Sequence, residues 1–123
     1  QNKMAVAQVR NKSGKFITPN LTSITAASNI DLPEDAKVSL TDTSNPDGYP
    51  ISSFTWALIY KEQNYKDRSG AKAKVLLDLL WWNIHDGQKY CEPLNYATLS
   101  KSAVTVAENL LKSATYNGQP ILK

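Results

Sequence analysis

The residues of this chain that could carry out chemistry are few and scattered. Among its 123 residues, His85 is the only histidine and Cys91 the only cysteine, and Asp86 is the nearest acidic neighbour. A zinc site needs several such ligands at set spacings, and a cysteine nucleophile needs an oriented base. Neither pattern surrounds this group. We therefore expect His85 to be a surface residue at a helix end, and we predict no metal site and no catalytic pair.

The acidic and hydroxyl residues are explained as well by local structure as by a site. Asp31, Glu34 and Asp35 lie around Pro33 in an expected loop, where carboxylates are normally solvated. The hydroxyls within residues 52–55 could bind an anion, but at a strand start they more often bond to the local backbone. The glycines stand alone, so no glycine-rich loop for phosphate is present. We therefore do not expect an enzyme.

Composition excludes several classes of protein. Hydrophobic residues make up 41% of the chain and charged residues 20%, which is typical of a globular domain, or part of one, rather than of a disordered segment. The net charge of +3 is not gathered in a basic run. Trp81 and Trp82 would point about 100° apart on a helix, so they form no base-stacking platform, and we expect them to fill a core. Nucleic acid is therefore not an expected partner.

Three features bear on the compartment. A single cysteine permits no disulfide within the chain. The apolar cluster at residues 75–84 is too short to span a bilayer. The first residues lack the pattern of a signal peptide, so we expect none in this chain.

The chain is organised around the stretch from Tyr49 to Lys61. It follows a polar loop at residues 45–48 and is apolar and aromatic until Lys61. In a strand, one face would carry Phe54, Trp56, Leu58 and Tyr60, and the other Thr55, Ala57 and Ile59. Because neither face is clearly polar, the pattern predicts a central β-strand covered on both sides.

Three helices are predicted, at residues 21–28, at residues 71–85 and after an N-cap at Ser100 or Ser102. The helix at 71–85 is apolar over roughly two-thirds of its circumference, so we expect protein on both of its flanks. The last helix has one apolar stripe and a polar face, which is typical of a surface helix. Strands are also expected within residues 5–10, 16–17 and 38–40, and turns at 11–15 and 116–120.

Several segments together carry a family resemblance. They are Tyr49-Pro50-Ile51-Ser52-Ser53-Phe54-Thr55-Trp56, then Leu58-Ile59-Tyr60-Lys61, residues 71–82, Asp86-Gly87-Gln88-Lys89-Tyr90, Leu94-Asn95-Tyr96-Ala97-Thr98-Leu99 and Asn117-Gly118-Gln119-Pro120, preceded by residues 5–16 and 23–28. In this combination and order the chain resembles the C-terminal portion of the periplasmic phosphate-binding proteins of phosphate ABC transporters. Thr98 departs from the proline that is usual in the family.

The resemblance implies an α/β architecture, in which a few-stranded sheet flanked by helices forms part of a type II periplasmic binding-protein fold. It implies that residues 1–48 are the C-terminal part of one lobe, residues 49–53 a hinge-proximal crossing, and residues 54–123 the strand and helices of the other lobe. The family's phosphate ligands lie mostly in its N-terminal portion, and their motifs have no counterpart here. No phosphate-binding residue is therefore assigned to this chain, and no cofactor is expected.

The implied function is capture of inorganic phosphate for ABC import, with this segment structural and hinge-forming. The partners would be inorganic phosphate, bound through the N-terminal portion, and an ABC permease, at a periplasmic or cell-surface location. A hinge segment can exchange between copies, so a swapped homodimer is also open. The alternative is a binding or adhesion module that kept the fold without transport. A hydrolase ranks third because no nucleophile–base pair is found.

Overall fold

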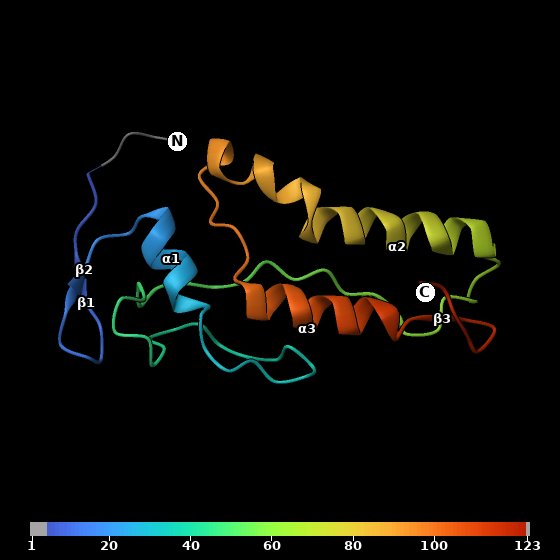
Figure 1. The fold of residues 1–123 in the computed structure, drawn as a ribbon, viewed down its shortest axis with the longest axis horizontal. Helices are drawn as coiled ribbons and strands as arrows, with labels where there is room; N and C mark the ends of the chain where they lie inside the picture. The colour runs from blue at the N-terminus through green and yellow to red at the C-terminus, as the bar shows by residue number, and fades with distance from the viewer. Residues whose placement is uncertain (1–4, 123) are drawn as a thin grey trace.

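The computed structural model describes residues 5–122, and Figure 1 shows two long helices with a largely extended connection running alongside them. A small hairpin and a short helix occupy the N-terminal end of the molecule, and a second small hairpin closes the C-terminal end. The elements are β1 (Val9–Arg10), β2 (Phe16–Ile17), α1 (Leu21–Ala27), α2 (Gly70–Ile84), the 3-10 helices η1 (Asp86–Tyr90) and η2 (Glu92–Leu94), α3 (Lys101–Lys112), β3 (Thr115–Tyr116) and β4 (Gln119–Pro120).

Each of the three α-helices begins at a polar cap that the sequence supplies. Asn20 and Ser23 form a reciprocal capping box at the start of α1. The side chain of Ser69 accepts a hydrogen bond from the Lys72 amide at α2, and that of Ser100 accepts one from the Ala103 amide at α3. The three predicted helices are thus confirmed, with Ser100 as the cap of the last.

The core lies between α2 and α3. Leu77 is fully buried, and Leu111 and Ala114 are buried against it. Partly buried side chains surround these three, namely Leu76, Leu80, Trp81, Ile84, Ile121 and Leu122. The apolar stripe of α3 therefore packs on one flank of α2, as expected for an amphipathic helix.

The opposite flank of α2 is open. Val75 is 68% exposed, Leu79 53% and Trp82 41%, so the described residues cover this helix on one side only. The prediction that protein covers both flanks of α2 is therefore not met by residues 5–122. Trp81 is partly buried against the core, as expected, but Trp82 is not.

The C-terminal hairpin closes the core at one end. Asn117 and Gly118 connect β3 to β4 with φ values of +53° and +73°. A two-residue loop with two positive φ angles is the turn that antiparallel strands favour, and Asn-Gly is its preferred sequence. The predicted turn at 116–120 is confirmed, and the hydrogen bond from the Ile121 amide to the Ala114 carbonyl (3.2 Å) ties the hairpin to the end of α3.

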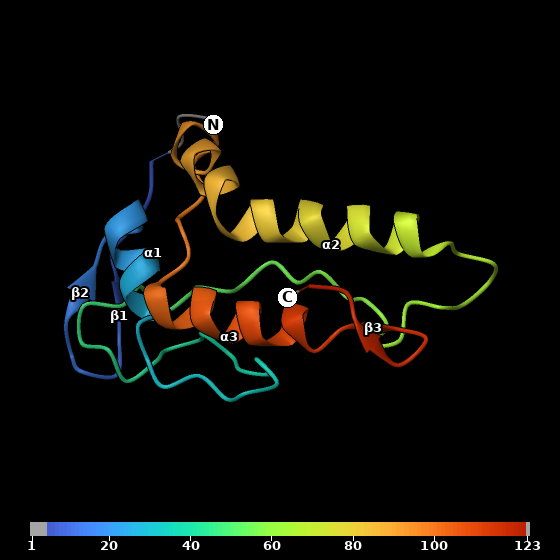
Figure 2. The same cartoon turned by 45° about the vertical axis from the view of Figure 1, so that its right-hand side comes forward.

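Two strand predictions are wrong for this structure. Residues 38–40 belong to a loop, and residues 54–60 form no ladder with any described segment. Figures 1 and 2 show residues 54–60, in green, running extended beside α3 toward the β3 end. The predicted central strand is uncovered, with Leu58 95% exposed. The physical reason is that residues 5–122 supply no neighbouring strand for it.

The class of the fold is nonetheless the expected one. Helices and small antiparallel sheets are mixed in one chain, with β1 paired to β2 and β3 paired to β4. The α/β prediction is confirmed, in a form compatible with part of a periplasmic binding-protein fold. The sheet consists of two separate hairpins, and an isolated parallel bridge joins Glu62 to Thr115.

Candidate functional site

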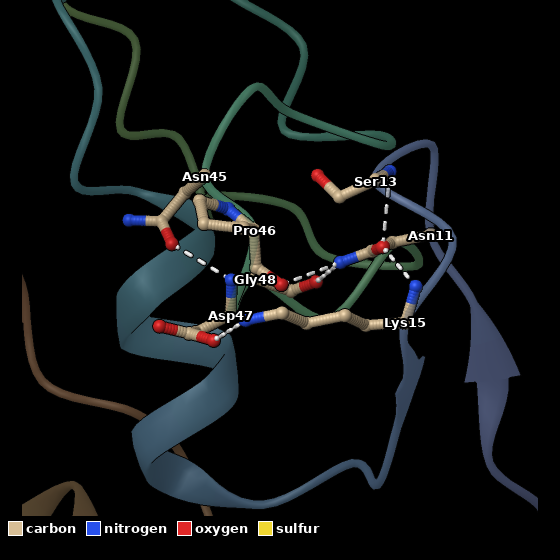
Figure 3. A network of polar contacts seen from close by, with 7 residues as sticks. All are labelled: Asn11, Ser13, Lys15, Asn45, Pro46, Asp47 and Gly48. Carbon is tan, nitrogen blue, oxygen red and sulfur yellow. Dashed lines mark hydrogen bonds and ion pairs between the residues drawn. The ribbon is translucent and has the colours of Figure 1, made fainter.

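The candidate site consists of the loop at residues 42–48 and the crossing at residues 49–53, which carry the chain from the N-terminal hairpin and α1 to the extended segment. The buried side chain of Asn11, in the β1–β2 turn, forms hydrogen bonds to the loop just before the crossing (Figure 3). The side-chain nitrogen of Asn11, Nδ2, donates to the Pro46 carbonyl (2.9 Å) and the Gly48 carbonyl (3.4 Å). Its oxygen accepts from the amides of Ser13 and Lys15, each at 3.1 Å. One side chain thus sets the turn and holds the loop against it.

Charged side chains at the surface add further contacts between the β1–β2 turn and this loop. Lys15 pairs with Asp47 at 2.8 Å, and both side chains are more than half exposed. The Lys12 amide donates to the Asp42 carboxylate at 2.7 Å. Exposed pairs of this kind contribute little to stability, so buried Asn11 is the principal anchor.

Close packing on α1 explains the glycine in this loop. A Cβ atom at Gly48 would lie 3.0 Å from the Cα of Ala27, which is tighter than a normal contact. The next residue, Tyr49, donates its amide hydrogen to the Ser23 carbonyl of α1 at 2.9 Å. The loop therefore lies directly on α1 as it enters the crossing.

The crossing itself is held by local hydrogen bonds. The Asp42 amide donates to the Pro50 carbonyl at 2.9 Å, and the Ser52 hydroxyl donates to the Tyr49 carbonyl at 2.8 Å. The Ser53 hydroxyl donates to the Phe54 carbonyl at 3.0 Å. The Ser52 and Ser53 hydroxyls thus bond to the local backbone, as hydroxyls at such positions often do.

Beyond the crossing, the chain loses its backbone hydrogen bonds over several residues. Among residues 5–122, the backbone of Trp56 to Ile59 makes no hydrogen bond, and the next backbone pairing begins at Lys61. Lys61 accepts from the Thr115 amide at 2.8 Å, and Gln63 donates to the Thr115 carbonyl at 2.7 Å. A tightly held crossing is thus followed by an extended segment that only its two ends fix.

A second connection joins the N-terminal part to the helices. The Ser100 hydroxyl, at the N-cap of α3, donates to the Ser28 carbonyl at 3.1 Å, and both residues are buried. The Thr25 hydroxyl donates to the Thr98 carbonyl at 3.3 Å. An open depression beside these contacts includes Thr22 and Lys101 in its lining. It gathers no cluster of cations that would mark an anion site.

His85 lies where the sequence predicted it, at the C-terminal end of α2. Its Nδ1 contacts the Trp81 carbonyl at 2.8 Å, and its Nε2 contacts Glu108 of α3 at 2.8 Å. These two partners raise the pKa of His85, the Trp81 carbonyl first, because both stabilise the protonated ring. The ion pair with His85 and nearby Lys112 lowers the pKa of Glu108. The pair links the two helices rather than facing a cavity.

The remaining residues considered for chemistry are not brought together. Cys91 is a partly buried free thiol beyond η1, and the loop around Asp31 and Glu34 remains irregular. Asp35 pairs with Lys37 across that loop. No group of three or more metal-binding side chains occurs among residues 5–122, and within the same range no helix is long and apolar enough to cross a membrane.

Two structurally important residues were missed by sequence reasoning. Asn11 begins a polar turn, so its bonds to the next residues follow from turn chemistry, but its contact with residues 46–48 has no local signal. Glu62 accepts hydrogen bonds from the Asn64, Asn117 and Gly118 amides and the Thr115 hydroxyl. The amides of Asn64 and Gly118 are the main reason that its pKa is lowered to about 2.

Comparison with known proteins gives this geometry a context. The chain is 37% identical over 99 residues to the phosphate-binding protein PstS of Methanocaldococcus jannaschii, across 72% of this chain and 25% of that protein. It is 29% identical over 111 residues to the phosphate-binding proteins PstS of two strains of Xylella fastidiosa, across 88% of this chain and 29% of theirs. No protein-family model matches the chain.

The chain thus spans between a quarter and a third of the length of the relatives it matches. The resemblance predicted from the motifs is confirmed, since curated relatives of that name match most of this chain. The relatives are named as binding proteins and not as enzymes. This chain is a PstS-like segment, related in sequence to part of the phosphate-binding proteins PstS.

Proposed function

We propose that this chain is the structural, hinge-forming segment of a solute-binding protein that captures inorganic phosphate for ABC import. The observation that carries the proposal is the relationship to PstS proteins over most of this chain but under a third of theirs. Because the chain is related to only about a quarter of each binding protein, we infer that it acts as one part of such a protein.

We take the proposed division into lobes from the resemblance to phosphate-binding proteins. Residues 1–48 are assigned to one lobe, residues 49–53 to the crossing near the hinge, and residues 54–123 to the strand and helices of the other lobe. Support comes from the hydrogen bonds of Asn11, which hold the loop just before the crossing within the first part. The unpaired backbone after Phe54 then leaves a place where chain direction can change.

The phosphate ligands are assigned to the part of the protein that has no counterpart in this chain. Support comes from the hydroxyls of Ser52 and Ser53, which bond to the local backbone, and from scattered lysines. Ligand closure would work through differential contact, because phosphate held by both lobes favours the closed state. The partners are then phosphate and an ABC permease, and the location is the periplasm or cell surface.

A chimera tests the proposal. The matching segment of the Methanocaldococcus jannaschii PstS protein is replaced by this chain, and phosphate binding is measured by isothermal titration calorimetry. We expect the chimera to bind phosphate and this chain alone to give no heat of binding. A folded chimera that does not bind phosphate contradicts the assigned function. Phosphate binding by this chain alone contradicts the placement of the ligands outside it.

The adhesion-module alternative has no specific support among the described contacts. The crossing does not indicate an adhesion surface, because the Tyr49 amide at its start bonds to α1 of the same chain. We therefore propose only the phosphate-capture function. The relatives' names point in the same direction.

A further inference from the structure

Asn117 is the one asparagine in the sequence that is followed by glycine, and both residues are exposed in the turn between β3 and β4. An asparagine side chain can be attacked by the backbone nitrogen of the residue after it, and glycine has no Cβ to hinder that attack. Asparagine belongs to the thermolabile residues of proteins. The Asn117-Gly118 pair is therefore the place in this chain where chemical loss of an amide is easiest.

The reaction needs water and no other partner. The Gly118 nitrogen gives up its proton and bonds to Cγ of Asn117, while the Cγ–Nδ2 bond breaks and ammonia leaves with that proton. The product is a five-membered imide ring. Water then opens the ring at either carbonyl, which gives aspartate, or isoaspartate whose main chain runs through Cβ and Cγ.

The structure holds both reacting groups in hydrogen bonds. Oε1 of Glu62 accepts from the Asn117 amide and Oε2 from the Gly118 amide, each at 3.0 Å. The Asn117 side-chain oxygen accepts from the side chain of Asn64. Glu62 is held in turn by the Thr115 hydroxyl (2.9 Å) and the Asn64 amide (2.8 Å). The attacking nitrogen and the group that it attacks are thus both engaged in the folded turn.

The shape of the turn also keeps these two groups apart. The φ values of +53° at Asn117 and +73° at Gly118 fit a type I′ turn, whose first central residue has a ψ of about +30°. At that ψ the nitrogen of the next residue lies nearly opposite Cβ about the Cα–C bond. Ring closure needs this nitrogen on the same side as Cβ. Asn117 therefore reacts only when the turn opens.

We propose that Asn117 is a site of spontaneous deamidation and that Glu62 controls its rate by holding the turn closed. Because the turn must open before the ring can form, the rate follows the fraction of chains in which the turn is open. The contacts that hold it lie within residues 62–118, so the proposal uses no other part of a longer protein. It goes beyond the proposed phosphate function and does not depend on it.

Deamidation would loosen one end of the core. Isoaspartate adds an atom to the backbone of a two-residue loop, and loop length sets the register of β3 against β4. Either product also places a second carboxylate beside Glu62, and like charges at close range repel. The hydrogen bond from the Ile121 amide to the Ala114 carbonyl depends on this hairpin. We therefore expect the modified chain to unfold at a lower temperature.

Peptide mapping by mass spectrometry measures the reaction, because each conversion adds one mass unit to the peptide that carries Asn117. The chain is incubated at a single pH and temperature, folded in buffer and unfolded in urea. We expect conversion at Asn117 in both samples, and several-fold more slowly in the folded one. Equal rates would overturn control by the turn. Unfolded chain that stays unmodified at Asn117 would overturn the choice of site.

Asn95 is a matched control within the same samples. It is also exposed and has a positive φ of 61°, but tyrosine follows it. The Tyr96 side chain hinders attack by its own backbone nitrogen even in the unfolded chain. We therefore expect Asn95 to convert much more slowly than Asn117 in urea, and equal conversion of the two would contradict the assignment.

Two variants test the role of Glu62. Glu62→Gln weakens the hydrogen bonds to both amides, and conversion in the folded chain should rise about three- to tenfold, which is the worth of one net hydrogen bond. Glu34→Gln removes the same charge from an exposed loop residue and should leave the rate unchanged. In urea, both variants and the wild-type chain should react alike.

Helical circular dichroism confirms that each incubated variant is folded, and the comparison of folded with unfolded wild-type chain needs no variant. Folded Glu62→Gln that reacts no faster than the wild-type chain would overturn control by Glu62. A slower reaction would overturn it as well, because it would mean that the carboxylate promotes loss of the Gly118 proton.

Discussion

At the scale of single residues, the Asn11 side chain has the largest share of polar restraint on the crossing. Two of its hydrogen bonds join the β1–β2 turn to Pro46 and Gly48, and two more hold Ser13 and Lys15 within that turn. Replacing it with alanine leaves the carbonyl of buried Gly48 and three partly buried backbone groups without this partner, which costs about 1–3 kcal/mol of unfolding free energy. Urea denaturation of Asn11→Ala measures this loss.

The matched control for that substitution is Asn29→Ala. Asn29 is exposed, and only its backbone makes hydrogen bonds among the described contacts. We expect its change in unfolding free energy to stay within about 0.5 kcal/mol, as for surface substitutions generally. Equal losses for the two variants would show that Asn11 does not anchor the loop.

His85 gives the molecule a pH dependence near neutrality. The Trp81 carbonyl and Glu108 raise its pKa in the folded state, so folding favours the protonated ring. Its contribution to stability is complete below the ordinary pKa of 6.5 and is lost as pH rises through the raised value. Unfolding free energy measured by denaturant titration should therefore fall across this interval.

Because His85 is the only histidine, its variant is a direct control. His85→Gln should remove the pH dependence in that interval, and Glu108→Gln should reduce it by removing the inter-helix partner. Stability that rises with pH in the wild-type chain over the same interval would contradict the raised pKa.

At the scale of elements, the two longer helices have equivalent caps with different surroundings. Ser100 caps α3 and also donates to the buried Ser28 carbonyl, whereas Ser69 caps α2 at the surface. Ser100→Ala should cost about 1 kcal/mol for the cap, and more because Ser28 then loses its partner. Ser69→Ala should cost less. Thermal unfolding of the pair measures the difference, and equal losses would count against a role for the Ser28 contact.

The C-terminal hairpin depends on one carboxylate. Hydrogen bonds from the Asn64 and Gly118 amides hold the pKa of Glu62 at about 2. Its stabilising effect is therefore present above the ordinary value of 4.5 and is lost as pH falls toward 2. Glu62→Gln should speed amide exchange at Asn117 and Gly118, and exposed Glu34→Gln should leave it unchanged. Unchanged exchange in Glu62→Gln would refute the anchoring role.

What the sequence predicts well in this chain is governed by local chemistry. The helices follow from apolar periodicity and from caps such as Ser100, and the last turn follows from Asn117-Gly118. What it predicts poorly depends on distant partners. The hydrogen bond from Asn11 to the Pro46 carbonyl joins residues 35 positions apart, and no periodicity in the sequence indicates such a contact. The resemblance, rather than local pattern, identified the family.

At the scale of the whole molecule, the failed strand prediction is informative. The pattern of residues 54–60 fits a strand with both faces covered, yet the structure leaves Leu58 95% exposed. Under the proposed function, we expect this cover to come from other parts of a longer solute-binding protein. We expect the same of the open flank of α2, where Val75 and Leu79 are exposed.

A single substitution tests this explanation by its contrasting effects. In this chain at concentrations where it is monomeric, Leu58→Lys should change unfolding free energy by no more than about 0.5 kcal/mol, because the side chain is already in water. In the PstS chimera the same change should cost more than about 4 kcal/mol, because a central strand would bury the charge without a partner. Denaturant unfolding of both proteins, each with its own Leu58 parent, measures the two costs. A small cost in the chimera would mean that residues 54–60 remain an open edge even in the longer protein, and would contradict the explanation that further strands cover them.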